Sequence, residues 1–182
     1  MKPIFTVHAG EYLAGSHIEK NFKNCRVWIP SKDTGIDLLV TNRNNTKSLS
    51  LQVKFSKDFA QTHMADFYKD KLIASTWFKL ATAKIKFSEA DNWLFVLQPF
   101  AEYACRFMLI KPLDLLRRIS AIHGRKDKYD LYFTITKQKR CYETRGLKEL
   151  KRREIVSAPA GDPKRDFTAS LDDWSPVEAI NR

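Results

Sequence analysis

Asp37, Gln52 and Lys54 are the side chains whose types and spacing best suit chemistry on a phosphodiester. Asp37 follows Gly35 by two positions, and only Val53 separates Gln52 from Lys54. Mg²⁺ prefers hard oxygen ligands and usually takes one or two carboxylates together with waters and phosphate oxygens. A lysine beside such a cation can orient the attacking water or help to deprotonate it. The pattern predicts a metal site formed by Asp37, the Gln52 amide oxygen and the Val53 carbonyl. Lys54 would then serve the nucleophile.

A predicted hairpin would bring these residues together. Residues 36–40, apolar except for Asp37, are typical of a buried strand, and residues 49–55 alternate apolar with polar side chains. Residues 41–47 between them are rich in turn formers, which favours an antiparallel connection. A hairpin centred near Asn45 sets Asp37 opposite Val53, which lies between the amide and the lysine. The alternative is a surface hairpin whose polar side chains are only solvated.

A predicted helix precedes the hairpin. Residues 10–22 carry apolar side chains at a spacing close to one helical face. Glu11 lies in the first turn of this helix, near the positive end of the helix dipole. His17 lies on the same helix and could approach the site, but we expect a solvated or capping role. Ser56 shares the strand face of Lys54, where it is either a phosphate ligand or an ordinary exposed serine.

In chain order, this arrangement resembles the PD-(D/E)xK nuclease superfamily. The superfamily pattern is a helix carrying Glu, then a strand, then a strand with Asp after a Gly, then a strand ending in an acidic or amide residue, one spacer and Lys. The matching positions here are Glu11, the strand 25–29, Asp37, Gln52 and Lys54. They cover roughly residues 7–57, and the rest of the chain follows only in outline. The resemblance implies an α/β, restriction-endonuclease-like fold with a central mixed β-sheet flanked by helices.

The resemblance also implies an activity, a cofactor and partners. The activity is magnesium-dependent hydrolysis of DNA by an endonuclease of restriction, genome defence or DNA repair. Mg²⁺ is the expected ion, with Mn²⁺ as the alternative, and Glu11 joins Asp37 and Gln52 as a metal ligand. A homodimer is expected in addition, because two copies related by a two-fold axis most simply cut both strands of a duplex.

Gln52 departs from the superfamily pattern, which most often has Glu or Asp at that position. The amide removes one negative charge, so we expect one tightly held metal ion rather than two. It also keeps open an alternative function, a catalytically inactive nucleic-acid-binding module with a nuclease-like fold. A third interpretation, an interaction subunit of a larger defence complex, is suggested only by the small size of the chain and by its C-terminal segment.

Composition is consistent with one compact domain. The chain has 182 residues, of which 43% are hydrophobic, enough for a single sizeable core. It has no apolar run long enough to cross a membrane and no signal peptide at its start, so a cytoplasmic protein without membrane contact is expected. Its three cysteines and four histidines are scattered, and their spacing predicts neither a zinc site nor a disulfide framework.

The formal net charge of +11 suits a nucleic-acid partner. The excess is greatest in residues 104–153, where fifteen Lys and Arg face five Asp and Glu. Such a run is often only a solvated surface, but here it accompanies a candidate phosphodiester site. We expect phosphate contacts from five of these side chains, namely Arg117, Arg118, Lys151, Arg152 and Arg153.

The remainder of the chain is predicted more coarsely. Helices are expected at 66–74, 77–89, 112–119 and 147–154, and strands at 92–97, 105–110 and 129–136. Residues 1–156 would form the nuclease-like domain. Residues 157–182, richer in Ala, Pro, Gly and Asp, would form a C-terminal arm or tail. The arm carries apolar side chains that would allow it to dock, and a disordered arm is equally compatible with its composition.

Overall fold

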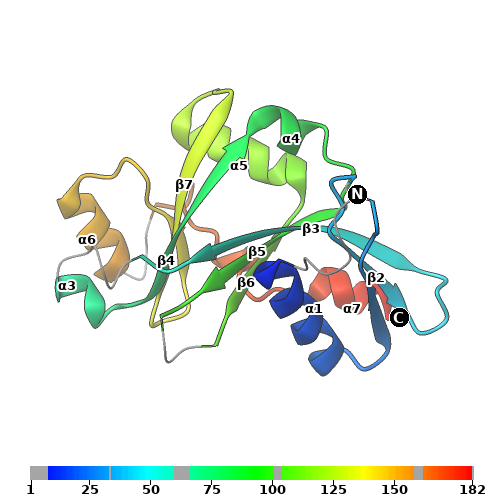
Figure 1. Ribbon diagram of the computed structural model, residues 1–182. Helices are drawn as coiled ribbons and strands as arrows, with labels where there is room; N and C mark the ends of the chain where they lie inside the picture. The colour runs from blue at the N-terminus through cyan, green and yellow to red at the C-terminus, as the bar shows by residue number, and fades with distance from the viewer. Residues whose placement is uncertain (1–7, 33, 60–65, 101–103, 158–161, 182) are drawn as a thin grey trace.

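The computed structural model describes residues 8–32, 34–59, 66–100, 104–157 and 162–181. It is a mixed α/β structure in which helices flank a mixed sheet (Figure 1). The helices are α1 (Ala9–Asn21), α3 (Asp66–Lys69), α4 (Thr82–Lys86), α5 (Pro112–His123), α6 (Glu149–Ser157) and α7 (Ser175–Ile180), with a 3₁₀ turn η1 (Thr168–Ser170). The strands are β1 (Cys25–Trp28), β2 (Leu38–Asn42), β3 (Ser48–Lys57), β4 (Leu72–Ala81), β5 (Asn92–Gln98), β6 (Arg106–Ile110), β7 (Lys128–Thr136) and β8 (Cys141–Glu143).

The larger sheet has five strands in the order β1-β2-β3-β5-β6. Its first three strands form an antiparallel meander, β5 runs parallel to β3, and β6 is antiparallel to β5. The parallel pair requires a crossover, and here the crossover contains α3, β4 and α4. Helices α1 and α7 cover one face of this sheet, where Ala14, Ile18 and Val177 are fully buried.

The second face of the five-stranded sheet is covered by a smaller sheet and by α5. The smaller sheet has the order β4-β7-β8. Phe78 of β4 and Phe133 of β7 meet Phe95 of β5 with ring centroids 4.9 and 5.5 Å apart, so aromatic rings join the two sheets. Because both faces are covered, the residues of β5 from Asn92 to Leu97 are all buried, as expected for a strand at the centre of a layered fold.

Most of the predicted elements are confirmed, including the first helix, the hairpin strands and the four elements between residues 92 and 136. The prediction of helices over 66–74 and 77–89 is wrong. Only short helices form, and β4 occupies most of the region. From Trp77 to Leu80 the side chains alternate between exposed and buried, the period of a strand. Ser75 and Thr76 are polar but buried in β4, where their hydroxyl groups bond to Thr134 Oγ1 and to the Phe133 carbonyl.

The predicted hairpin forms, but its register differs from the prediction by one residue. Leu38 faces Leu51 and Val40 faces Leu49, so Asp37 precedes the first ladder pair and is not set opposite Val53. The apolar pattern decides this, since a one-residue slip would turn every buried side chain to the other face. In the observed register, the backbone N–H of Asp37 donates to the Leu51 carbonyl at 2.9 Å.

The described part of the C-terminal segment packs against both layers. Phe167 is fully buried among the side chains between the two sheets, and Trp174 packs with Phe22 and Phe107 on the α1 face. Asp172 accepts hydrogen bonds from the Phe107 backbone and from the Arg106 guanidinium. Of the two alternatives for the C-terminal arm, docked or disordered, residues 162–181 are therefore docked. Among the described residues, none of the helices combines the length and apolar composition needed to cross a membrane.

Candidate active site

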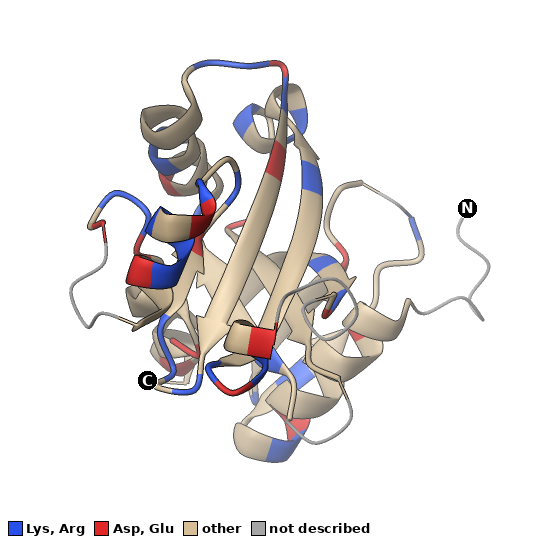
Figure 2. Cartoon of the chain, turned by 90° about the vertical axis from the view of Figure 1, so that its left-hand side faces the viewer, with Lys and Arg blue, Asp and Glu red and all other residues tan. Residues whose placement is uncertain are grey.

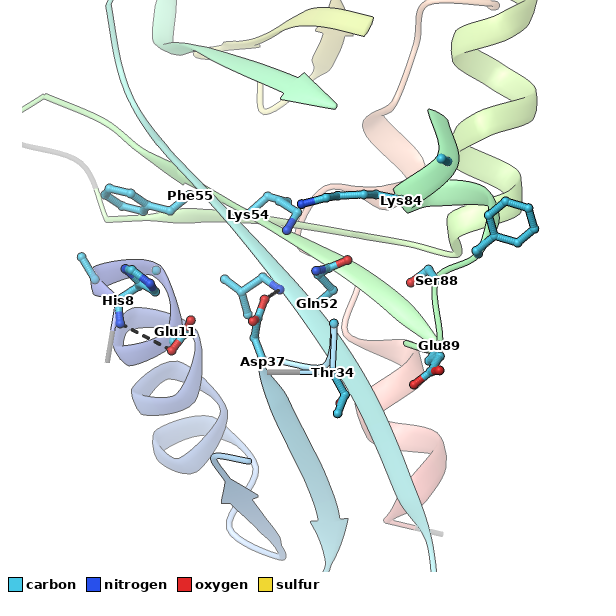
Figure 3. Close-up of a pocket in the computed structure, with 16 residues that line it drawn as sticks. His8, Glu11, Thr34, Asp37, Gln52, Lys54, Phe55, Lys84, Ser88 and Glu89 are labelled. Atoms are coloured by element: carbon cyan, nitrogen blue, oxygen red, sulfur yellow. Dashed lines mark hydrogen bonds between the residues drawn. The ribbon is translucent and has the colours of Figure 1, made fainter. Parts of the chain in front are cut away.

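An open pocket of about 970 Å³ lies where α1, β2, β3 and α4 come together (Figure 3). Its walls are the first turn of α1, the loop before β2, the centre of β3, and α4 with the loop that follows it. All four predicted catalytic residues line this pocket: Glu11, Asp37, Gln52 and Lys54. Helix α1 and the β2–β3 hairpin thus deliver one set of polar side chains to one cavity.

Asp37 is fixed by the edge of β3. Its Oδ2 accepts a hydrogen bond from the Val53 backbone N–H at 2.8 Å. The N–H and C=O of one strand residue point to the same side, so the Val53 carbonyl also faces the edge where Asp37 lies. Because the β2–β3 ladder ends at the Leu38–Leu51 pair, this edge lies beyond the paired strands. A carboxylate and a backbone carbonyl are therefore neighbours on the floor of the pocket.

Glu11 reaches the same pocket because α1 approaches β3 very closely. Gly10 makes this possible: a Cβ at that position would lie only 2.6 Å from Cβ of Phe55. The Glu11 side chain is 5% exposed and its Oε2 accepts a hydrogen bond from the His8 backbone N–H at 3.4 Å. Figure 3 shows its carboxylate directed toward Asp37. The glycine therefore allows the first turn of α1, which carries Glu11, to lie against β3.

Lys54 extends over a fixed aromatic ring. Its Nζ lies 5.1 Å from the centroid of the Trp93 ring, which is nearly fully buried. The Trp93 indole N–H in turn donates to Ser88 Oγ at 2.9 Å. Gln52, two positions earlier on the same face of β3, is in register with Trp93. Both side chains thus stand on a strand whose neighbour, β5, is buried from Asn92 to Leu97.

Lys84 is a pocket residue that the sequence did not reveal. It lines the pocket from α4 and Figure 3 shows it extending toward Lys54, so two cations face the acidic wall. His8, Thr34, Ser88 and Glu89 also line the pocket and were not predicted. No spacing rule links these positions to the hairpin. Lys84, Ser88 and Glu89 arrive through the crossover between β3 and β5, whose path is set by tertiary packing, whereas His8 precedes α1 and Thr34 precedes β2.

Two side chains that were weighed as site residues lie elsewhere. His17 is placed between Phe107 and Trp174, with ring centroids 4.5 and 4.7 Å away, and does not line the pocket. Burial lowers the pKa of this histidine, as does Lys20, against the opposing effect of Asp172. Ser56 Oγ accepts a hydrogen bond from the Trp77 backbone N–H at 3.1 Å and so joins β3 to β4.

The five predicted phosphate-binding cations lie outside the pocket lining. Arg118 holds the C-terminal segment: it donates to the Asp166 carbonyl and its guanidinium lies 4.0 Å above the Phe167 ring. Arg117 pairs with Asp114 at 2.9 Å. The other three, Lys151, Arg152 and Arg153, belong to α6, which lies beside α3 at the left of Figure 1, away from α1. Their contact with phosphates stays a prediction.

The donor set of the pocket fits one hard divalent cation. Within the described ranges, no group of three His, Cys, Asp or Glu side chains converges as a metal cluster. The pocket instead offers two carboxylates, Glu11 and Asp37, with the Gln52 amide oxygen and the Val53 carbonyl as neutral donors. Mg²⁺ commonly binds through one or two carboxylates and keeps several waters, so this set is sufficient for one ion.

Comparisons of the chain with profiles of protein families, with curated proteins and with solved structures give no match. Function is therefore inferred from the geometry of the pocket.

Proposed function

We propose that this chain is a magnesium-dependent DNA endonuclease of the PD-(D/E)xK superfamily, with a restriction-endonuclease-like fold. One observation carries the proposal: Glu11, Asp37, Gln52 and Lys54 follow the order of the superfamily pattern and all line a single pocket, although the pattern most often has an acidic residue at the position of Gln52. They come from α1, the residue that precedes β2 and the centre of β3, which is the element order of that pattern. Restriction, genome defence and DNA repair are the roles in which such an activity would serve.

The side chains divide the work between metal binding and substrate binding. The carboxylates of Glu11 and Asp37, the Gln52 amide oxygen and the Val53 carbonyl would hold Mg²⁺, or Mn²⁺ in its place. When bound, the ion acts as a Lewis acid on the phosphodiester and lowers the pKa of a coordinated water. Lys54 Nζ would orient the attacking water.

Lys84 adds a second positive charge on the wall formed by α4. A cation at this position binds a non-bridging phosphate oxygen and stabilises the negative charge that develops there. Lys54 and Lys84 together therefore hold the substrate phosphate against the acidic wall. Two copies of the chain, related by a two-fold axis, would cut both strands of a duplex.

Gln52 supports a second candidate function, a nucleic-acid-binding module that lacks the reaction. An amide in place of a carboxylate weakens the attraction for cations, and a site that has lost activity would tolerate it. The retention of both acidic side chains and of Lys54 in one pocket favours the active enzyme.

A plasmid assay separates these two functions. Purified protein is incubated with supercoiled plasmid in Mg²⁺, in Mn²⁺ and in EDTA. The endonuclease converts the plasmid to nicked or linear forms with either metal and leaves it intact in EDTA. Protein that shifts the plasmid on a gel but cuts it with neither metal is the inactive binding module.

A further inference from the structure

A basic ridge borders the pocket along α4. We define the ridge by five exposed side chains on two adjacent segments, Lys84, Lys86, Arg125, Lys126 and Lys128. The loop 124–128 carries the last three and is tied to the start of α4, because Thr82 N–H donates to the Asp127 carbonyl at 2.8 Å. Figure 2 shows this blue loop at the top of the molecule beside the blue bands of α4. Asp127 is the only acidic side chain in residues 82–88 and 124–128.

The ridge differs from the other basic surface of the molecule, on α6. There, Lys151 pairs with Glu154 at 3.0 Å and Arg153 pairs with Glu149 at 2.8 Å, so acidic neighbours offset the charge. In the part of the chain that the structure describes, none of the five ridge side chains forms an ion pair. Their charge is thus directed to solvent, where it can attract a phosphate backbone.

Phe87 gives the ridge an aromatic surface at the mouth of the pocket. Phe87 is a large apolar residue, yet it is 73% exposed, and it lines the pocket. The backbone that carries the ring is held in place, because the Phe87 N–H bonds to the Ala83 carbonyl at 3.0 Å and Ile85, two positions earlier, is fully buried. Lys86 Nζ lies 5.2 Å from the ring centroid. An exposed aromatic ring among cations is the combination on which unpaired bases stack.

We infer that this ridge binds single-stranded DNA, with phosphates along its cations and one base stacked on Phe87. A duplex hides the faces of its bases, so the ring can be used only by an unpaired nucleotide at a single strand, a strand end or an opened duplex. The ridge leads directly to Lys84 and the pocket, so the bound strand is delivered to the candidate metal site. The identification of that strand as the substrate rests on the proposed endonuclease function, whereas its binding does not.

The test is equilibrium binding in EDTA, where cleavage cannot interfere. The probes are fluorescein-labelled oligo(dT) of roughly 16 nucleotides, a length that the larger single-strand sites cover, and a blunt duplex of the same length. Phe87→Ala should raise the Kd for oligo(dT) about tenfold, the loss expected for one stacked base, and change the Kd for the duplex less than about twofold. Phe87→Trp should restore binding. The control is Phe100→Ala, which removes another exposed phenylalanine that does not line the pocket.

The cations are tested by salt dependence. Lys126→Ala/Lys128→Ala should flatten the slope of log affinity for oligo(dT) against log salt by about 0.7 per lost contact. Lys151→Ala/Arg153→Ala on α6, whose predicted phosphate contacts are with a duplex, should leave the slope for oligo(dT) unchanged. Equal losses in Phe87→Ala and Phe100→Ala, or a slope altered only by the α6 pair, would overturn the inference. Intact ridge binding without any metal-dependent cleavage would refute the proposed enzyme and leave the ridge standing.

Discussion

Gly10→Ala tests whether the close approach of α1 to β3 is what places Glu11 in the site. The added Cβ would lie 2.6 Å from Phe55 Cβ and 3.3 Å from Val53 Cγ1, and ordinary contact begins at 3.4 Å. The helix must therefore move by about 0.8 Å, since both neighbouring atoms are close to the backbone of β3. Overpacking of this kind costs about 1–3 kcal/mol, and the better helix propensity of Ala returns up to about 1 kcal/mol.

The expected consequence is a larger loss of activity than of stability. Displacement by about 1 Å of a group in a site can cost about 100-fold in rate. We expect cleavage by Gly10→Ala to fall by about that factor at fixed Mg²⁺, to require more Mg²⁺ for half-maximal rate, and unfolding free energy to fall by about 1–2 kcal/mol. Plasmid cleavage across a Mg²⁺ titration and urea unfolding measure the two effects.

Two variants of the same helix serve as controls. A Cβ at Gly15 would lie 3.5 Å from Val27 Cγ1, an ordinary contact, so Gly15→Ala should keep full activity and gain up to about 1 kcal/mol. Ile18→Val, at a fully buried position, should lose about 1 kcal/mol and remain active. Wild-type cleavage and Mg²⁺ dependence in Gly10→Ala would refute the reasoning, and so would an equal loss of activity in Ile18→Val.

Three further predictions concern single side chains. Gln52→Glu should retain or raise cleavage and lower the Mg²⁺ concentration needed, because an added carboxylate strengthens cation binding; a loss of cleavage in this variant would show that Gln52 contacts the substrate instead. Lys84→Ala should lower the rate about 100-fold with little change in Tm, since this side chain is exposed, and an unchanged rate would remove it from the site. His17 has a lowered pKa, so the unfolded chain takes up the proton first as the pH falls and stability declines below about pH 6.5. Thermal unfolding should show this decline in the wild type and a smaller one in His17→Phe; equal declines would contradict it.

The sequence predicts the local elements of the site because they carry strong local patterns. The alternation of β3 and the turn formers around Asn45 establish the hairpin, and Asn45 adopts a positive φ of 55° that asparagine tolerates. The predicted register is wrong by one residue, because turn composition does not define the centre of a loop. The pairing of Leu38 with Leu51 across the sheet defines the observed register.

The opposite wall of the pocket could not be predicted for a different reason. Strand β4 carries Ser75 and Thr76 at fully buried positions, and their burial depends on partners in β7 that are distant in sequence. Without β4, the crossover to β5 has no defined path. Lys84 and Phe87 depend on that path, so their place at the pocket follows from tertiary packing and not from spacing along the chain.

The central claim is that the pocket is a metal-dependent phosphodiesterase site, and Asp37→Asn tests it most directly. Asparagine preserves the size of the side chain and an oxygen that can accept the Val53 N–H, so the fold should be retained. The measurement is the single-turnover cleavage rate of wild type and variant at saturating Mg²⁺, with DNA affinity measured in EDTA on the same preparations. The account predicts a fall in rate of at least about 100-fold with unchanged affinity, because binding depends on distributed cations. Cleavage by Asp37→Asn at the wild-type rate would contradict it.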